Sequence, residues 1–105
     1  SPNTPIINLV KKLAQSFKII IVSGRDGCCR KETEKWLVDN EVPVDQFFMR
    51  PAGDVRRDSV IKEEIFYRFI EPMFEVELVL DDRNQTVAKW RELGLTCLQV
   101  ADGDF

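Results

Sequence analysis

The sequence contains no histidine, which excludes the usual Ser-His and Cys-His catalytic arrangements. Its three cysteines, Cys28, Cys29 and Cys97, show no Cys-x-x-Cys spacing, so a zinc site is not expected. An odd number of cysteines with one adjacent pair is also a poor framework for disulfides. This cysteine usage indicates a protein of a reducing compartment.

Long apolar runs and an excess of positive charge are absent as well. No run of eighteen apolar residues occurs, so we expect no membrane-spanning helix. The first five residues lack the regions of a signal peptide, and without an initiator methionine we expect a processed or truncated chain. The net charge of −3 means that the chain as a whole lacks the excess of positive charge that is typical of nucleic-acid-binding proteins. A local basic patch that binds nucleic acid remains compatible with this charge.

What is present is an ordinary globular composition of single-domain length. At 105 residues and 44% hydrophobic, the chain is expected to form one domain over residues 1–105. Helices are expected at 4–16, 30–40, 59–70 and 84–93, and strands at 18–23, 47–50, 78–80 and 95–100. This alternation predicts an α/β fold with a mostly parallel sheet and helices on both faces.

Several local features accompany these elements. Thr4 is the expected N-cap of the first helix and Asp58 that of the third. Trp36 and Leu37 are expected to face inward from the second helix. The third helix is expected to bury one apolar face made of Ile61, Ile65 and Phe69, widened by Phe66 and Ile70. The strand at 78–80 is expected to be buried on both faces.

Chemically active side chains follow three of the predicted strands. They are Ser23-Gly24-Arg25 after the first strand, Arg50 at the end of the second, and Asp81-Asp82 after the third. The carboxyl ends of parallel strands meet at one edge of a sheet, which is where α/β proteins bind ligands. We therefore expect a hydroxyl, several cations and two carboxylates to gather at one edge.

The acidic pair suits a metal ion. Asp81 and Asp82 place two like charges side by side, and a cation would relieve their repulsion. Carboxylate oxygens are hard ligands of the kind that Mg²⁺ prefers. The alternative is that Asp82 or a neighbour simply caps the following helix.

The hydroxyl and the cations suit an anion. Ser23 and the glycine after it would let an anion reach a hydroxyl and exposed backbone N–H groups, with Arg25 adding a charge-assisted fork. The alternative is an ordinary strand-to-helix turn. The most basic section contains Arg50, Arg56, Arg57 and Lys62, and it reads equally as an anion-binding patch or a solvated loop of mixed charge.

Four segments carry a resemblance to a known family. Residues 19–25, 53–66 and 80–85 match its second, third and fourth motifs in order, and residues 100–105 resemble its ending. On these segments the chain resembles the phosphatase domain of the haloacid dehalogenase superfamily, in the version attached to bacteriophage polynucleotide kinase/3′-phosphatase. The resemblance covers nearly the whole chain from Lys18 on and implies a three-layer, Rossmann-like fold.

The resemblance implies four catalytic residues. Ser23 would hydrogen-bond the transferring phosphoryl group, and Lys62 would neutralise that group and its covalent intermediate. Asp81 and Asp82 would hold or orient Mg²⁺. These roles fit phosphoryl transfer, in which enzymes act mainly through positioning and charge stabilisation.

It also implies a substrate and a setting. Gly24, Arg25 and Arg50 would contact the phosphate or the nucleic-acid strand. The substrate would be a 3′-phosphorylated DNA or RNA end, and a kinase domain would belong to the parent protein. The expected location is the cytoplasm, of the host cell for a viral protein, with no membrane partner.

One departure from the family is large. The family's nucleophile is an aspartate in a first motif, strand-Asp-x-Asp-Gly-Thr, and this sequence contains no such segment. The single Asp-x-Asp, Asp102-Gly103-Asp104, lacks the threonine and aligns with the family's ending. We therefore expect a partial domain that lacks its nucleophile and the central strand carrying it.

Two hypotheses follow from this departure. The chain is the C-terminal part of a Mg²⁺-dependent polynucleotide 3′-phosphatase, inactive by itself, or it is a non-catalytic binding or assembly module of the same fold. In either case the missing strand would leave an unpaired gap or an exposed edge in the sheet. Such an edge favours a homodimer or strand swapping.

Overall fold

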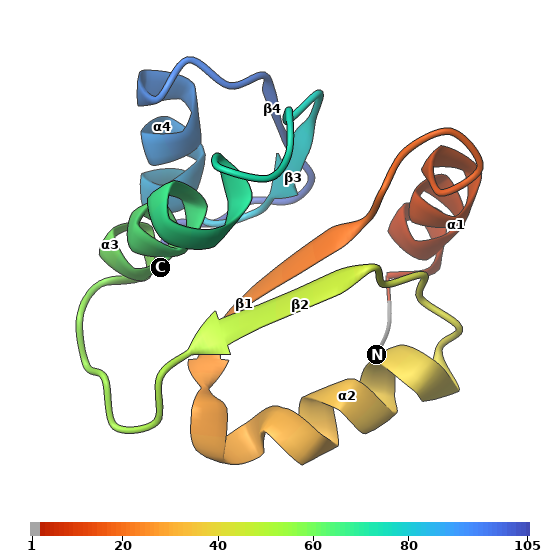
Figure 1. Cartoon of the computed structure of the whole chain (residues 1–105), viewed down its shortest axis with the longest axis horizontal. Coiled ribbons are helices and arrows are strands. Elements are labelled where there is room, and N and C mark those ends of the chain that lie inside the picture. Colours follow the sequence, from red (N-terminus) through yellow and green to blue (C-terminus); the bar gives the residue numbers. More distant parts are fainter. Residues whose placement is uncertain (1–2) are drawn as a thin grey trace. The chain divides into compact units, whose positions relative to one another are not determined.

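The computed structural model describes residues 3–105, which form two compact units. The first unit extends to Asp54 and the second begins at Val55. In Figure 1 the first unit runs from red to yellow-green and the second from green to blue. Each unit contains two helices and two parallel strands of its own.

The first unit consists of α1 (Thr4–Leu13), β1 (Ile20–Asp26), a short 3₁₀ turn (Gly27–Cys29), α2 (Arg30–Asp39) and β2 (Gln46–Arg50). β1 and β2 pair in parallel, starting with Ile20 opposite Gln46 (Figure 1). The register shifts near the end of β1, where Ser23 lies opposite Met49 and Asp26 lies opposite Arg50. β1 therefore bulges at residues 24 and 25.

The second unit consists of α3 (Asp58–Ile65), a π-helical turn (Phe66–Ile70), β3 (Val79–Asp81), α4 (Asn84–Glu92) and β4 (Cys97–Gln99). β3 and β4 pair in parallel, with Val79 opposite Cys97 and Asp81 opposite Gln99. The apolar core of this unit is made of Ile61, Ile65, Phe66, Ile70, Val87, Trp90 and Cys97. It holds α3 and α4 together beside the carboxyl end of β3.

The predicted α/β fold with parallel strand pairing is confirmed. Among residues 3–105, however, the strands form two separate two-stranded ladders, so β1 pairs only with β2 and β3 only with β4. The expected gap or exposed edge in the sheet stays a prediction. The strand at 78–80 was expected to be buried on both faces, and this was wrong: Leu78, Val79 and Leu80 are only half-buried. A strand with a neighbour on one edge alone keeps part of its surface accessible.

Both predicted caps were wrong. Thr4 is already helical, and Oδ1 of Asn3 accepts from the N–H of Ile6 at 3.4 Å, so Asn3 caps α1. Asp58 is the first residue of α3, and the capping position is held by Arg57 without a side-chain hydrogen bond. Asp58 is buried instead, because its carboxylate bonds to groups inside the second unit.

Two aromatic residues predicted to face inward are exposed. Phe69 is 45% exposed because the helix changes to π geometry, shown by the N–H of Glu71 donating to the carbonyl of Phe66. The wider turn brings Ile70, rather than Phe69, onto the buried face. In α2 the buried stripe consists of Thr33 and Leu37. Trp36 lies at the margin of that stripe and is 44% exposed.

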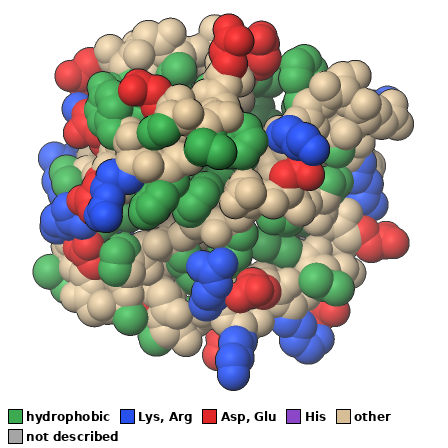
Figure 2. Space-filling model, viewed as in Figure 1, with side chains coloured by type: hydrophobic (Ala, Val, Ile, Leu, Met, Phe, Trp, Pro, Cys, Tyr) green, Lys and Arg blue, Asp and Glu red, His purple; other side chains and the backbone are tan. Residues whose placement is uncertain are grey.

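The surface carries charges of both signs. Figure 2 shows blue and red side chains interspersed with green apolar ones on the face it presents. The helices of residues 3–105 include none with both the length and the apolar character needed to cross a bilayer.

Candidate active site

Lys62 is the centre of a buried cluster of charges in the second unit. Its ammonium nitrogen lies 3.0 Å from Oδ2 of Asp81 and 3.2 Å from Oδ2 of Asp58. Asp58 stands one turn earlier on α3, and Asp81 ends β3. From the sequence, Lys62 could have been either an exposed lysine or part of an anion-binding patch. The first interpretation is wrong, because Lys62 is only 9% exposed.

Asp81 is fully engaged by protein donors. Its Oδ2 accepts from Lys62 Nζ and from Trp90 Nε1, both at 3.0 Å. Its Oδ1 accepts from the backbone N–H groups of Asp82 at 2.8 Å and Arg83 at 3.3 Å. Burial by itself would raise the pKa of Asp81, but the Lys62 ammonium and these hydrogen bonds outweigh it and lower the pKa. Asp81 is therefore held as a carboxylate in one orientation.

Asp82 differs from its neighbour. It is exposed, and α4 is capped at Arg83 without a side-chain hydrogen bond, so Asp82 does not cap the helix. Its backbone is fixed instead: its carbonyl accepts from Gln99 Nε2 at 3.0 Å. A Cβ on Gly103 would lie 1.6 Å from that same carbonyl oxygen, so the chain can pass there only as glycine. The backbone is anchored while the carboxylate faces solvent.

This donor set fits part of a magnesium site. Mg²⁺ in phosphoryl-transfer enzymes keeps several waters and takes one or two carboxylates plus substrate phosphate oxygens. The exposed Asp82 carboxylate can serve as such a ligand, whereas both oxygens of Asp81 already accept protein hydrogen bonds. No group of three His, Cys, Asp or Glu side chains suited to a metal occurs in the described chain. Further ligands would have to come from elsewhere.

The predicted phosphate loop lies in the first unit, around the bulge in β1. The Ser23 hydroxyl oxygen accepts from the backbone N–H of Arg25 at 3.2 Å. The Arg25 guanidinium donates to the hydroxyl of Thr33 on α2 at 3.3 Å, although the residue as a whole is exposed. The loop is thus a defined turn with an exposed arginine. This geometry is compatible both with an anion-binding loop and with an ordinary strand-to-helix turn.

Arg50 ties this loop to the turn that follows β2. Its Nε donates to the carbonyl of Gly24 at 2.7 Å, and its Nη1 donates to the carbonyl of Asp54 at 2.9 Å. Asp26 adds a second connection, because its carboxylate accepts from the N–H of Gly53 at 2.9 Å. Arg50 therefore supports the backbone of the loop, and its predicted contact with substrate stays a prediction.

The site residues predicted from the sequence fall into two groups. Ser23, Gly24, Arg25 and Arg50 belong to the first unit, and Lys62, Asp81 and Asp82 belong to the second. Within the second unit Lys62 and Asp81 are in direct contact. The convergence of both groups on one anion stays a prediction. The basic section is partly neutralised, since Arg56 pairs with Glu64.

Comparison with known proteins identifies the family. The family model described as "Polynucleotide kinase PNKP phosphatase domain" matches residues 1–105. The chain belongs to this family. The haloacid dehalogenase-type phosphatase domain recognised from the motifs is thereby confirmed.

Solved and curated relatives agree with this assignment. Chains in the structures of a Pnkp1/Rnl/Hen1 complex and a Pnkp1/Rnl/Hen1 RNA repair complex match all of this chain with a TM-score of 0.96 and 42% identity. A "Putative bifunctional polynucleotide kinase/RNA ligase" of Autographa californica nuclear polyhedrosis virus is 34% identical over 91 residues, or 84% of this chain. The chain spans 37% and 34% of the two matched structures and 13% of the viral relative.

Three buried polar residues of this phosphatase-family chain were missed at the sequence level. Asp58, Thr86 and Trp90 all bond to the cluster around Lys62. The spacing of Asp58 and Lys62, four residues apart in a predicted helix, was a usable signal for an ion pair. Thr86 and Trp90 gave no comparable signal, because their partners lie in distant segments.

Proposed function

We propose that this chain supplies the anion-binding and lysine–acid parts of a polynucleotide 3′-phosphatase. The observation that carries the proposal is the buried Lys62–Asp81 pair beside the exposed carboxylate of Asp82. This arrangement occurs in a chain matched over its whole length by a phosphatase-domain family. A fixed cation next to a metal-binding carboxylate is suited to stabilising the charge of a transferring phosphoryl group.

The substrate we propose is a 3′-phosphorylated nucleic-acid end, with RNA favoured over DNA. The names of the relatives support this choice, because they describe a polynucleotide kinase/RNA ligase and an RNA repair complex. We also propose that kinase and ligase activities accompany this domain in its parent protein or complex. The domain would act in a system that repairs nucleic-acid ends in the cytoplasm of the cell.

Each residue has a defined part in the proposed reaction. Ser23 and the backbone of Gly24 hydrogen-bond the phosphoryl oxygens, while Arg25 and Arg50 contact the phosphate or strand. Lys62 offsets the negative charge of the group in transfer. Asp82, with the anchored Asp81 beside it, would hold a Mg²⁺ ion, which would supply charge neutralisation at the phosphate.

Hydrolysis also requires an aspartate nucleophile from outside these 105 residues, because the sequence lacks the family's first motif. In the proposed first step a carboxylate oxygen of that aspartate attacks phosphorus. The P–O3′ bond breaks, and the 3′ oxygen leaves as a hydroxyl after taking up a proton. Water then cleaves the acyl phosphate, which returns the carboxylate and releases inorganic phosphate.

The test compares this chain with a version extended upstream to include an Asp-x-Asp-Gly-Thr strand. Both are given 3′-phosphorylated oligoribonucleotides and oligodeoxyribonucleotides, and inorganic phosphate release is measured with Mg²⁺ and with a chelator. The extended version is expected to hydrolyse the substrate only with Mg²⁺, and the 105-residue chain to be inactive. An extended version that folds and binds the oligonucleotide without hydrolysis would favour the non-catalytic module instead.

A pair of matched variants separates the metal role from a general effect of charge. Asp82→Asn is expected to abolish most hydrolysis and to raise the Mg²⁺ concentration needed for what remains. Asp104→Asn removes another exposed carboxylate, from the single Asp-x-Asp of the chain, and is expected to retain full activity. Loss of activity in Asp104→Asn would contradict the assignment of the nucleophile to an aspartate outside these 105 residues.

A further inference from the structure

Two buried side chains of helix α4 donate hydrogen bonds to the carboxylates around Lys62. The hydroxyl of Thr86, a residue with 0% exposure, donates to Oδ2 of Asp58 at 2.5 Å. The indole N–H of Trp90 donates to Oδ2 of Asp81 at 3.0 Å. The two residues are four positions apart, so both donors lie on one face of α4.

Each of these donors shares its acceptor atom with the lysine. Oδ2 of Asp58 lies 3.2 Å from Lys62 Nζ, and Oδ2 of Asp81 lies 3.0 Å from the same nitrogen. The ammonium is therefore held between two carboxylates, and each carboxylate is held in turn from α4. Carboxylates this deeply buried need such partners, since an unpaired buried charge is strongly unfavourable.

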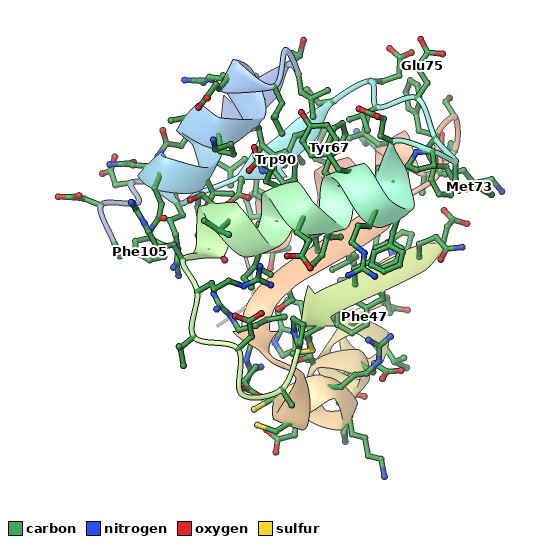
Figure 3. The ribbon with its side chains drawn as sticks, turned by 60° about the vertical axis from the view of Figure 1, so that its left-hand side comes forward. Phe47, Tyr67, Met73, Glu75, Trp90 and Phe105 are labelled. Atoms are coloured by element: carbon green, nitrogen blue, oxygen red, sulfur yellow. The ribbon has the colours of Figure 1, made fainter. Side chains whose placement is uncertain are left out.

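The donors are themselves fixed by packing. The Trp90 ring packs edge-on against Phe66, with ring centroids 6.1 Å apart and planes at 76°. Figure 3 labels Trp90 on the side of α4 that faces α3. Residue Trp90 is only 4% exposed, so its indole N–H has little room to turn away from Asp81. A hydrogen bond from a rigid ring fixes the direction of its acceptor as well as its position.

We propose that Thr86 and Trp90 are positioning residues for Lys62, acting through Asp58 and Asp81. This inference rests on the proposed phosphatase function, because the position of the ammonium matters where negative charge develops on a phosphoryl group. Neither residue touches substrate. Each prevents a carboxylate from rotating, so the ammonium between them stays in one place and needs no rearrangement during the reaction.

The kinetic test uses the upstream-extended domain and variants that remove one donor each. Trp90→Phe keeps an aromatic ring without the N–H, and Thr86→Val keeps the shape without the hydroxyl. Both are expected to lower kcat about 10- to 100-fold, the range found for residues that orient the ligands of a metal site, with little change in KM. Thr86→Ser restores a hydroxyl and is expected to recover most of the rate lost in Thr86→Val.

A matched control separates positioning from packing. Val87 lies on the same helix and is 2% exposed, but its side chain has no polar group to bond to either carboxylate. Val87→Ala is expected to lower Tm while kcat, measured well below Tm, stays at the wild-type value. If Trp90→Phe and Thr86→Val behave like Val87→Ala, the two residues only pack and the proposal is overturned.

A second readout does not depend on activity. In the 105-residue chain with ¹⁵N-labelled lysine, the Lys62 ammonium is expected to give a slowly exchanging NMR signal in the wild type and in Val87→Ala. The signal is expected to broaden or vanish in Trp90→Phe and Thr86→Val. If it does so while the extended domain shows no hydrolysis, the phosphatase proposal fails and the positioning stands. An unchanged signal in both variants would overturn the positioning.

Discussion

The ammonium nitrogen of Lys62 lies 3.0 Å from Oδ2 of Asp81, a residue nineteen positions further along the chain. Both side chains are almost buried, with 11% and 8% of their surfaces exposed. The pair joins α3 to the end of β3, so it contributes to the fold of the second unit as well as to the candidate site. Its behaviour can therefore be tested by stability measurements alone.

Replacing Lys62 is expected to be costly for folding. Lys62→Met would leave the carboxylate of Asp81 buried without a cation and that of Asp58 with only Arg83, whose Nε lies 4.0 Å from Asp58 Oδ2. We expect a loss of about 3–5 kcal/mol in the free energy of unfolding. Urea denaturation followed by circular dichroism measures this loss. Lys89→Met is the control and should cost much less, because Lys89 pairs with Glu63 and Glu92 near the surface, where ion pairs contribute little to stability. Equal losses in the two variants would contradict the buried pair.

The acid sensitivity of the fold should depend on Asp81. Burial alone would raise its pKa, but the Lys62 ammonium and the hydrogen bond from Trp90 lower it below the ordinary 3.8. A lowered pKa in the folded state stabilises the fold above the unfolded pKa, and that stability is lost as the pH falls through the folded value. Trp90→Phe should reduce this contribution, so its unfolding free energy should change less steeply with pH below about 4. Unfolding free energies measured across that range decide the matter.

Gly103 should tolerate no side chain. A Cβ there would lie 1.6 Å from the carbonyl oxygen of Asp82, so Gly103→Ala must displace the backbone after β3. We expect a loss of about 1–3 kcal/mol and shifted amide NMR signals at Asp82 and Asn84. Gly94→Ala is the control: Gly94 has φ of +86° with open space around it, so alanine should cost about 1–2 kcal/mol there without moving those signals.

Cys28 should be a slow nucleophile despite its exposure. Its hydrogen bond with Asp26, supported by the contact with Cys29, raises the pKa of the Cys28 thiol to about 11. The rate of alkylation by iodoacetamide should therefore still be rising well above pH 9, because the thiolate is the reacting form. Asp26→Asn should move the rate profile to lower pH. Mass spectrometry that assigns the label to Cys28 or Cys29 checks this, and a plateau near pH 9 in the wild type would contradict it.

The chain should associate with itself as its concentration rises. In the described chain β1 and β3 each pair along one edge, and an open strand edge is a template for pairing with another chain. Sedimentation velocity over a range of concentrations should show a dimer growing at the expense of the monomer. Joining the upstream strand should suppress it. A chain that stays monomeric at every concentration would count against open edges.

The order of elements was predictable because it depends on local patterns. The apolar run that ends at Asp81 and the glycine stop at Gly94 located β3 and the end of α4 to within a few residues. These signals come from neighbouring residues, which set backbone preference and periodicity. The same holds for the motif resemblance, which rests on short segments and is confirmed by the family match.

The roles of single polar residues were harder to predict, because they depend on distant partners. Asp58 was expected to cap α3, since acidic residues are common caps, but Thr86 lies 28 positions away and draws its carboxylate inward. Phe69 was wrongly predicted to be buried, because no local sequence pattern indicates the change to π geometry at Phe66–Ile70. The contact between Lys62 and Asp81 needed the fold, and the meeting of Ser23 with them remains a prediction.

The bulge in β1 determines which insertions and deletions the segment between Ser23 and Asp26 can accept. Between Met49 and Arg50 the partner strand advances one residue, while β1 advances from Ser23 to Asp26. The surplus is an even number of residues, so the alternation of faces is the same before and after it. Deleting Gly24 and Arg25 together would keep the Asp26 carboxylate turned towards Gly53, whereas deleting one of them would turn it to the opposite face. Insertions and deletions here should therefore be accepted in pairs.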